Sequence, residues 1–164
     1  MFFSLTTAAF AHKYNYGYSF DVIGFKCGGS NCQYIASSAS MKWNDAANTR
    51  IGEAPYANNL IAHYEYSDNW LGLYKPNPVV AGGVTEFSIH INKRTISDYQ
   101  ARTYPNSTYY TIAISTAVHE LGHALFLNDQ PDGTDTSVMS YYRIRTNTTP
   151  RYHDVQDVKS YRGY

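Results

Sequence analysis

His119-Glu120-Leu121-Gly122-His123 lies inside a long and mostly apolar segment, residues 110–127. If this segment is helical, apolar side chains cover most of its circumference, because they recur at Ile114, Ala117, Val118, Leu121, Ala124 and Leu125. A helix that is apolar on nearly every side belongs in the interior of a domain. We therefore predict a buried helix over residues 110–127, with two histidines and a glutamate inside it.

The two histidines of this segment have the spacing of metal ligands. Side chains four residues apart share one helical face, so His119 and His123 can bind the same ion while Glu120 projects beside it. Zinc binds neutral imidazole nitrogens at about 2.0–2.1 Å, and a rigid helix presets two of them. The pattern predicts a zinc site in which Glu120 takes a proton from the zinc-bound water and passes it to the leaving amine.

A catalytic zinc ion also needs a third protein ligand and an open fourth position. No glutamate follows Glu120 in the chain, so a glutamate supplied by a later helix is excluded. The donors available downstream are Asp129, Asp132, Asp135, His153, Asp154 and Asp157. We favour Asp129, which lies six residues after His123, where a turn can fold its carboxylate back onto the ion. Asp132 and Asp135 are the alternatives.

The rest of the chain alternates between strand and helix patterns. Aromatic and β-branched residues predict a strand over residues 14–26, and further strands are predicted over 59–66 and 84–91. Apolar residues at three- and four-residue steps predict an amphipathic helix over 33–48 and a short one over 154–161. Pro76, Pro78 and the Gly82-Gly83 pair break the chain between the later strands. This order predicts an α+β domain.

Length and charge exclude several classes of protein. The chain has 164 residues, and its 13 Lys and Arg balance 13 Asp and Glu, so it has no basic excess for nucleic acid or an anionic membrane. No apolar run reaches the roughly 18 residues that a membrane-spanning helix needs. We expect one domain over residues 1–164, acting as a monomer, with neither nucleic acid nor a membrane as partner.

Two features bear on the cellular compartment. The flexible residues 28–31 can bring the sulfurs of Cys27 and Cys32 together, so we expect a disulfide, with two free thiols as the alternative. Residues 1–11 are small and apolar, and Ala9-Phe10-Ala11 resembles a signal-peptidase site, although the first basic residue is Lys13. We expect the remnant of a signal peptide or the lead-in to the first strand, and we favour a secreted protein.

Together, the His-Glu-x-x-His pattern, Asp129 and Met139 resemble the metzincin clan of zinc endopeptidases. The motif of that clan, HExxHxxGxxH or HExxHxxGxxD, is followed by a turn that contains Met. The residues around the two histidines are similar to matrixins, and an Asp as third ligand is similar to snapalysins. Ser137-Val138-Met139-Ser140-Tyr141 resembles the Met-turn of serralysins, in which the Tyr two residues after Met can ligate zinc.

The resemblance implies a fold and a set of roles. The fold is a zincin domain with a small mixed twisted sheet, a long buried active-site helix, a Met-turn and a C-terminal helix. The zinc ligands would be His119, His123 and Asp129. Glu120 and Tyr141 would be catalytic, with simple packing as the alternative for Tyr141, and Met139 would form the packed base of the site.

Residues 84–91 would be the upper edge of the cleft and would pair with an extended substrate, unless they form a plain edge strand. Residues 141–150 would form a wall of the pocket for the residue after the scissile bond.

One residue departs from the pattern of the clan. The glycine of the motif falls at position 126, where this chain has Phe126. The glycine allows a left-handed conformation as the chain leaves the helix, and a Phe there costs roughly 1–2 kcal/mol. We expect either that Phe126 stays helical and the turn occurs at Asn128, or that an acid other than Asp129 is the ligand.

The leading interpretation is a secreted zinc endopeptidase that acts on protein or peptide substrates. One alternative is a catalytically inactive module of the same fold that binds peptides or glycans through some of its 17 Tyr residues. Another is a zinc hydrolase of a non-protein cell-wall substrate. Glu120 argues against the inactive module, because a domain that only binds needs no general base beside two zinc ligands.

Overall fold

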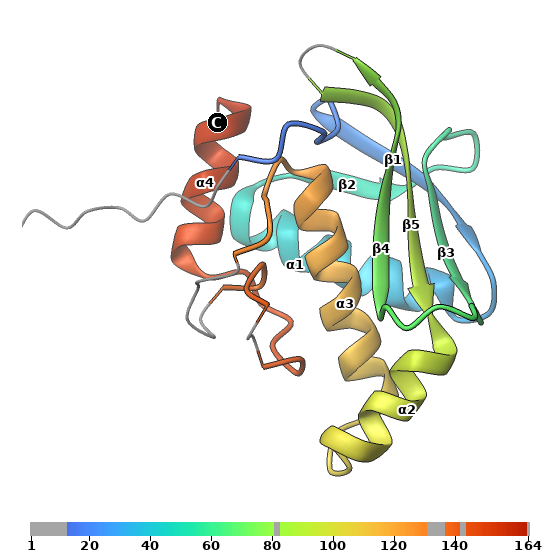
Figure 1. The fold of residues 1–164 in the computed structure, drawn as a ribbon. Coiled ribbons are helices and arrows are strands. Elements are labelled where there is room, and N and C mark those ends of the chain that lie inside the picture. The colour runs from blue at the N-terminus through green and yellow to red at the C-terminus, as the bar shows by residue number, and fades with distance from the viewer. Residues whose placement is uncertain (1–12, 81–82, 131–136, 142–143, 164) are drawn as a thin grey trace, which may run out of the picture.

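A five-stranded sheet forms the centre of the computed structural model, which describes residues 13–80, 83–130, 137–141 and 144–163 (Figure 1). The strands are β1 (Val22–Gly28), β2 (Arg50–Glu53), β3 (Leu60–Tyr64), β4 (Gly72–Val80) and β5 (Gly83–Asn92). Their order across the sheet is β2-β1-β3-β5-β4. Neighbouring strands are parallel except for β4, which runs antiparallel to β5 at one edge.

The described residues also form the helices α1 (Cys32–Ala47), α2 (Lys93–Thr103), α3 (Tyr109–Ala124) and α4 (Tyr152–Arg162). Figure 1 shows α3 between strand β4 and helix α4. Trp43 of α1 is fully buried, and its Nε1 donates a hydrogen bond to the carbonyl of Val118 in α3 over 2.9 Å. This bond connects the two central helices. The mixture of strands and helices confirms the predicted α+β class.

Most predicted elements are confirmed with small changes at their ends, namely α1, α3, α4, β3 and β5. The strand predicted over residues 14–26 is only partly right, because β1 begins at Val22. The segment before it runs beside the end of α3 instead, where Tyr14 N donates to Phe126 O over 2.8 Å and Tyr18 N donates to Ala124 O over 2.9 Å. Its aromatic residues are therefore used to pack against helix α3.

The sequence patterns do not predict β2, β4 or α2. Pro76 and Pro78 lie within β4 and do not break the chain there, because an edge strand tolerates a proline whose missing N–H faces away from its neighbour. Helix α2 buries one residue, Ile96, and is otherwise mostly polar, so few apolar residues mark it in the sequence. Short or exposed elements of this kind leave little signal in a sequence.

The prediction that residues 84–91 form the edge of the sheet is wrong. Strand β5 lies between β3 and β4, and its backbone is paired on both sides. The edge strand is β4. A peptide that adds a strand to this sheet on the side of α3 must therefore pair with β4.

The predicted disulfide is not present, because Cys27 and Cys32 are free thiols. Cys32 is the first residue of α1, and its Sγ donates to the carbonyl of Ile61 over 3.0 Å. A hydrogen bond with Cys32 is the main reason why the pKa of Cys27 is raised. The alternative expectation, two free thiols, describes this pair.

No helix in the described part of the chain is long and apolar enough to cross a membrane. Residues 1–11, which we interpret as a signal remnant or a lead-in, lie outside the described residues.

Candidate metal centre

Helix α3 carries three of the predicted site residues in its last two turns. His119, Glu120 and His123 have exposed fractions of 7%, 5% and 8%, so all three are buried. The helix begins at an N-cap residue, Thr108, whose side chain accepts a hydrogen bond from Thr111 N. Because the surroundings of this helix are apolar, burying three polar side chains there costs free energy unless each has a hydrogen-bonding or ionic partner.

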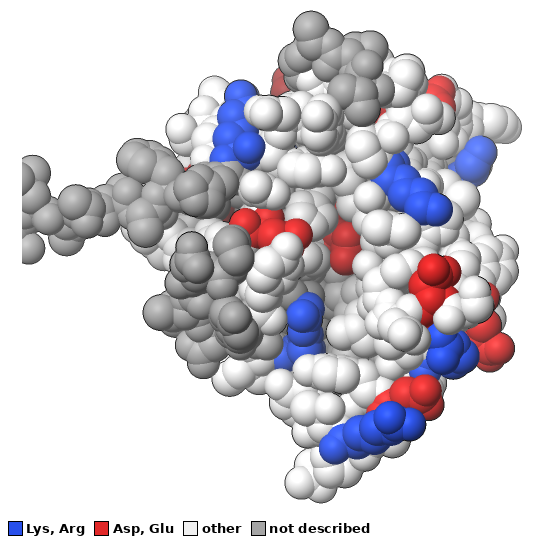
Figure 2. Space-filling model, viewed as in Figure 1, with Lys and Arg blue, Asp and Glu red and all other residues white. Residues whose placement is uncertain are grey.

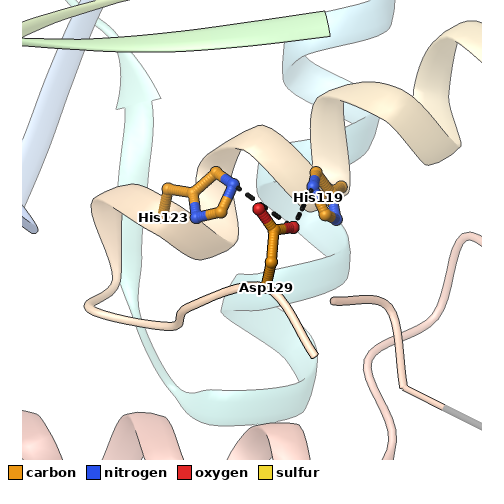
Figure 3. Close-up of side chains that lie close together, drawn as sticks. All are labelled: His119, His123 and Asp129. Carbon is orange, nitrogen blue, oxygen red and sulfur yellow. Dashed lines mark ion pairs between the residues drawn. The ribbon is translucent and has the colours of Figure 1, made fainter. Parts of the chain in front are cut away.

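Asp129 joins the two histidines from the loop after α3 (Figure 3). Asp129 Oδ1 lies 3.2 Å from His119 Nε2 and 3.9 Å from His123 Nε2. Among the described residues, these three are the group of His, Cys, Asp and Glu side chains whose arrangement suits a metal ion. Asp132 and Asp135, the alternatives for the third ligand, lie outside the described residues.

Backbone carbonyls fix the orientation of both imidazole rings. His119 Nδ1 lies 2.9 Å from Val138 O, and His123 Nδ1 lies 2.9 Å from Leu127 O. A carbonyl oxygen can only accept, so each Nδ1 carries a proton and donates it. In the neutral ring each Nε2 then has a lone pair, which is the form that binds a metal.

The donor set fits a zinc ion. Two imidazole nitrogens and a carboxylate are ordinary zinc ligands, and tetrahedral ligand atoms at about 2.0–2.1 Å from zinc lie roughly 3.3 Å from one another. The two separations between a histidine Nε2 and Asp129 Oδ1, 3.2 and 3.9 Å, are close to that value. Because two lone pairs and an anionic oxygen converge, a cation among them removes their mutual repulsion.

The turn that delivers Asp129 occurs at Phe126, so our expectation of a helical Phe126 with the turn at Asn128 is wrong. Phe126 is left-handed, with a φ of 71°. Leu127 N donates to Gly122 O over 2.9 Å, and Phe126 N donates to His123 O over 3.1 Å. These two bonds form the Schellman motif that commonly ends a helix with a glycine at the left-handed position.

The ring of Phe126 is held by groups from distant parts of the sequence. It is 9% exposed, and a Cβ added at Gly17 would lie 2.5 Å from its Cγ, so Gly17 leaves the room that the ring fills. Lys13 Nζ and Arg162 Cζ lie 5.7 and 5.8 Å from the ring centroid. Burial of a large apolar side chain is worth about 1.5–3 kcal/mol, which offsets the backbone strain.

Met139 lies directly beneath the histidine helix. A Cβ added at Gly122 would lie 2.4 Å from Met139 Sδ and 3.4 Å from Trp43 Cζ2. Met139 is fully buried, as the prediction of a packed base requires. The glycine between the two histidines therefore permits the close contact between α3 and the segment that carries Met139.

A buried carboxylate holds this segment in place. Asp154 of α4 has no exposed surface, and it accepts hydrogen bonds from Ser137 Oγ (2.5 Å), Val138 N (3.2 Å) and Arg151 N (2.8 Å). Because Val138 O in turn accepts from His119, Asp154 is linked to the metal centre through a single residue. This role differs from the ligand role that we considered for Asp154.

The metal centre opens into a groove of about 600 Å³. Figure 2 shows this face hollowed at its centre, with acidic side chains inside the hollow. Glu120 lines the groove, and so do Tyr141 and strand β4 from Gly72 to Tyr74. A Cβ added at Gly72 would lie 2.6 Å from Glu120 Oε1, so the edge strand passes directly beside the predicted general base.

Tyr141 lies at the same groove, and its side chain is hydrogen-bonded to Asp129. The negative charge of Asp129 is the main cause that raises the pKa of Tyr141, so its hydroxyl stays protonated near neutral pH. With 53% of its surface exposed, Tyr141 is accessible to a molecule in the groove.

Sequence reasoning misses two aromatic residues that frame His123. The ring centroids of Tyr14 and Tyr74 lie 5.2 and 5.9 Å from that of His123. Tyr74 OH donates to Tyr16 O over 2.9 Å, and burial raises the pKa of Tyr74. Nothing in the sequence distinguishes these two from the other tyrosines, since the strand and the loop that carry them are not predicted at their true positions.

Solved structures share this fold at low sequence identity. A chain of the GM1-bound form of the ECX AB5 holotoxin matches with a TM-score of 0.62 and 15% identity, covering 92% of this chain and 86% of that one. Archaemetzincin from Methanopyrus kandleri matches with a TM-score of 0.53 and 9% identity, covering 88% and 97%. Myroilysin matches with a TM-score of 0.55 and 13% identity, covering 92% and 82%. No model of a known protein family and no curated protein matches the sequence. The likeness concerns the fold, which is metzincin-like.

Proposed function

We propose that this chain is a zinc-dependent endopeptidase of the metzincin type, with an Asp ligand as in snapalysins and a Met-turn like that of serralysins. The observation that carries the proposal is the convergence of His119, His123 and Asp129 beside Glu120 at an open groove. The names of two structural neighbours, archaemetzincin and myroilysin, agree with it. When bound by these three residues, zinc supplies Lewis-acid polarisation of a carbonyl and acidification of water.

Glu120 is the proposed proton carrier. The residue as a whole is 5% exposed and it lines the groove, so it can meet a substrate there while it is largely shielded from water. We assign it two transfers: it takes a proton from the attacking water, and it delivers that proton to the nitrogen of the leaving amine. The adjacent strand residue, Gly72, leaves room for the carboxylate.

Tyr141 is the proposed donor to the oxygen of the scissile carbonyl. Its hydroxyl is protonated and lies at the metal centre through its contact with Asp129. A donor aimed at the position where negative charge develops stabilises the transition state more than the ground state. Tyr141→Phe removes the hydroxyl alone, and we expect it to lower kcat more than it raises KM.

Strand β4 is the proposed guide for the peptide main chain. It is the edge of the sheet on the groove side, and it contributes Gly72, Leu73 and Tyr74 to the groove, next to Leu71 of the preceding loop. An edge strand has unpaired N–H and C=O groups that an extended peptide can pair with. The proposed substrate is therefore an extended segment of a protein or peptide.

The test is cleavage of a mixed peptide library by zinc-loaded protein, read by mass spectrometry of the new termini. We expect wild type to cleave internal bonds and Glu120→Gln to lose activity by about 10²-fold or more. Glu65→Gln is the matched control, because Glu65 is exposed and outside the groove. Zinc-loaded wild type that cleaves no peptide would contradict the proposal and would favour a binding module or a hydrolase of another polymer.

A further inference from the structure

A single cation lines the groove of the metal centre among the Lys and Arg residues that the structure describes, and it is Arg145. The acidic side chains of the groove are Glu120 and Asp129, which lie with the two histidines at the candidate metal centre. Figure 2 shows blue side-chain atoms below the red ones near the centre of this face. Because few charged side chains line the groove, a single cation among them can contribute strongly to the recognition of a ligand.

The partners of Arg145 are neutral. Its guanidinium donates to Tyr141 O over 3.4 Å and is hydrogen-bonded with the side chain of Tyr99. Its backbone N donates to the hydroxyl of Tyr104 over 3.4 Å. No Asp or Glu in the described ranges lies within ion-pair distance of Arg145. Hydrogen bonds to neutral groups therefore fix the orientation of the Arg145 side chain. Its positive charge has no acidic partner among those residues.

Arg145 lies close to the candidate metal centre. Tyr141 contacts both groups: its side chain is hydrogen-bonded to Asp129, and its carbonyl accepts from Arg145. Arg145 is thus separated from the candidate ligand Asp129 by one residue, Tyr141, and it also contacts Tyr99 of α2, which lines the groove. A substrate group that reaches Arg145 belongs to a residue next to the scissile bond or very near it.

We propose that Arg145 binds a carboxylate of the substrate, so that this protein selects peptides with an acidic group adjacent to the cleaved bond. A guanidinium pairs with a carboxylate through two parallel hydrogen bonds, and such charge-assisted bonds are stronger than neutral ones. Two sources supply this chemistry, an Asp or Glu side chain and the free carboxylate at the end of a short peptide. The inference rests on the proposed peptidase function and names its substrate class.

The experiment compares cleavage of matched peptides that differ in one group. One pair has Glu or Gln next to the scissile bond, with an amidated C-terminus. A second pair has no acidic side chain and ends in either a carboxylate or an amide near that bond. We expect wild type to prefer the carboxylate member of one pair by about tenfold or more. The pair that shows the preference identifies the source.

Reversing the charge at position 145 tests whether Arg145 causes the preference for a carboxylate. We expect Arg145→Glu to abolish it and to favour a peptide with Lys at the same position, whereas Arg145→Lys keeps part of it. Arg102→Glu is the matched control, because it makes the same change in net charge at an exposed position of α2 outside the groove. It should leave the preference as in wild type.

Peptide binding separates this inference from the proposed function. The same peptides, labelled with a fluorophore, are titrated against zinc-loaded Glu120→Gln with and without Arg145→Glu, and anisotropy reports their affinity. If wild type cleaves nothing but the acidic peptides bind more tightly in an Arg145-dependent way, the peptidase proposal fails and the carboxylate site stands. If peptides are cleaved or bound with no preference for a carboxylate, or if Arg145→Glu leaves a preference unchanged, the inference is overturned.

Discussion

Phe126 shows how one residue can occupy a conformation that ordinarily favours glycine. Its φ of 71° is the left-handed conformation that directs the chain from His123 back to Asp129. The ring is enclosed by Gly17 and by the cationic groups of Lys13 and Arg162. The metal centre thus depends on contacts made by both ends of the described chain.

We predict that Phe126→Gly is more stable than Phe126→Ala by about 1 kcal/mol. Both variants lose the packing of the ring, which costs about 3–5 kcal/mol for a buried Phe. The alanine variant also keeps the strain of the left-handed backbone, whereas glycine does not. The free energy of unfolding in urea, measured for both variants, gives the difference. An alanine variant as stable as the glycine variant would show that position 126 is not strained.

A second prediction at the scale of single residues concerns Gly122. Gly122→Ala should destabilise the protein by about 1–3 kcal/mol, because the new methyl group meets Met139 Sδ at 2.4 Å. On helix propensity alone the same change would stabilise by about 1 kcal/mol. Gly52→Ala is the control, since nothing lies within 4 Å of a Cβ added there. Thermal unfolding that ranks the two variants in the opposite order would contradict the close contact.

The identity of the converging residues could be predicted from the sequence, but the way they converge could not. The spacing of His119 and His123 fixes their common face, and Asp129 follows at a distance that one turn can span. The turn itself depends on Gly17 and Arg162, which are more than 30 residues away from Phe126 in the sequence. A local pattern therefore places the turn at Asn128, and tertiary contacts place it at Phe126.

At the scale of elements, the outer edge of strand β4 begins with backbone N–H donors beside Glu120 and is then interrupted by two prolines. Leu71 O accepts from Asn92 N of the neighbouring strand over 2.9 Å, so odd-numbered residues of β4 face β5 and even-numbered residues face outward. The outward positions are Gly72, Tyr74, Pro76, Pro78 and Val80. Since proline has no N–H, the outward backbone donors are Gly72 and Tyr74 at the end beside Glu120 and Val80 at the far end, with none between them.

We predict that lengthening a peptide along β4 beyond the residue that pairs with Tyr74 does not increase its affinity. In the double variant Pro76→Thr and Pro78→Thr, two outward N–H groups are restored, and we expect longer peptides to bind several-fold more tightly. A length series of labelled peptides bound to Glu120→Gln measures this. Equal gains with length in both proteins would contradict a blocking role for the prolines.

Asp154 couples helix α4 to the metal centre, and this coupling is also testable. We predict that Asp154→Ala destabilises the protein by about 3 kcal/mol, because two buried donors and one partly buried donor lose their acceptor. It should also weaken zinc binding, since Val138 positions His119. Asp45→Ala, at an exposed position of α1, is the control. Calorimetry with and without zinc would contradict the coupling if Asp154→Ala changed stability but left zinc affinity as in wild type.

At the scale of the whole molecule, the sequence patterns predict the buried elements well and the exposed ones poorly. Helices α1 and α3 have many buried side chains at helical spacing, and both are predicted within a few residues of their ends. The exposed α2 and the proline-containing β4 have weak patterns, so they are missed. This omission matters for function, because the edge of the sheet was then assigned to β5.

The molecule as a whole is organised around one helix. Helix α3 is buried between the sheet and the segment that carries Met139, and its histidines face a groove that is open to solvent. Rigid surroundings preset the ligands, and the open groove leaves space for a substrate. Preset ligands and an open groove are the two properties that a catalytic zinc ion held by the three converging side chains would need.

The most direct test of this account is the zinc content of extensively dialysed protein, measured by elemental analysis for wild type, Asp129→Ala and Asp98→Ala. Asp98 is an exposed residue of α2 and does not line the groove. The account predicts one zinc ion per chain in wild type and in Asp98→Ala, and loss of zinc in Asp129→Ala. Folded wild type that binds no added zinc, or an Asp129→Ala variant that retains it with unchanged affinity, would contradict the assignment of His119, His123 and Asp129 as the metal centre.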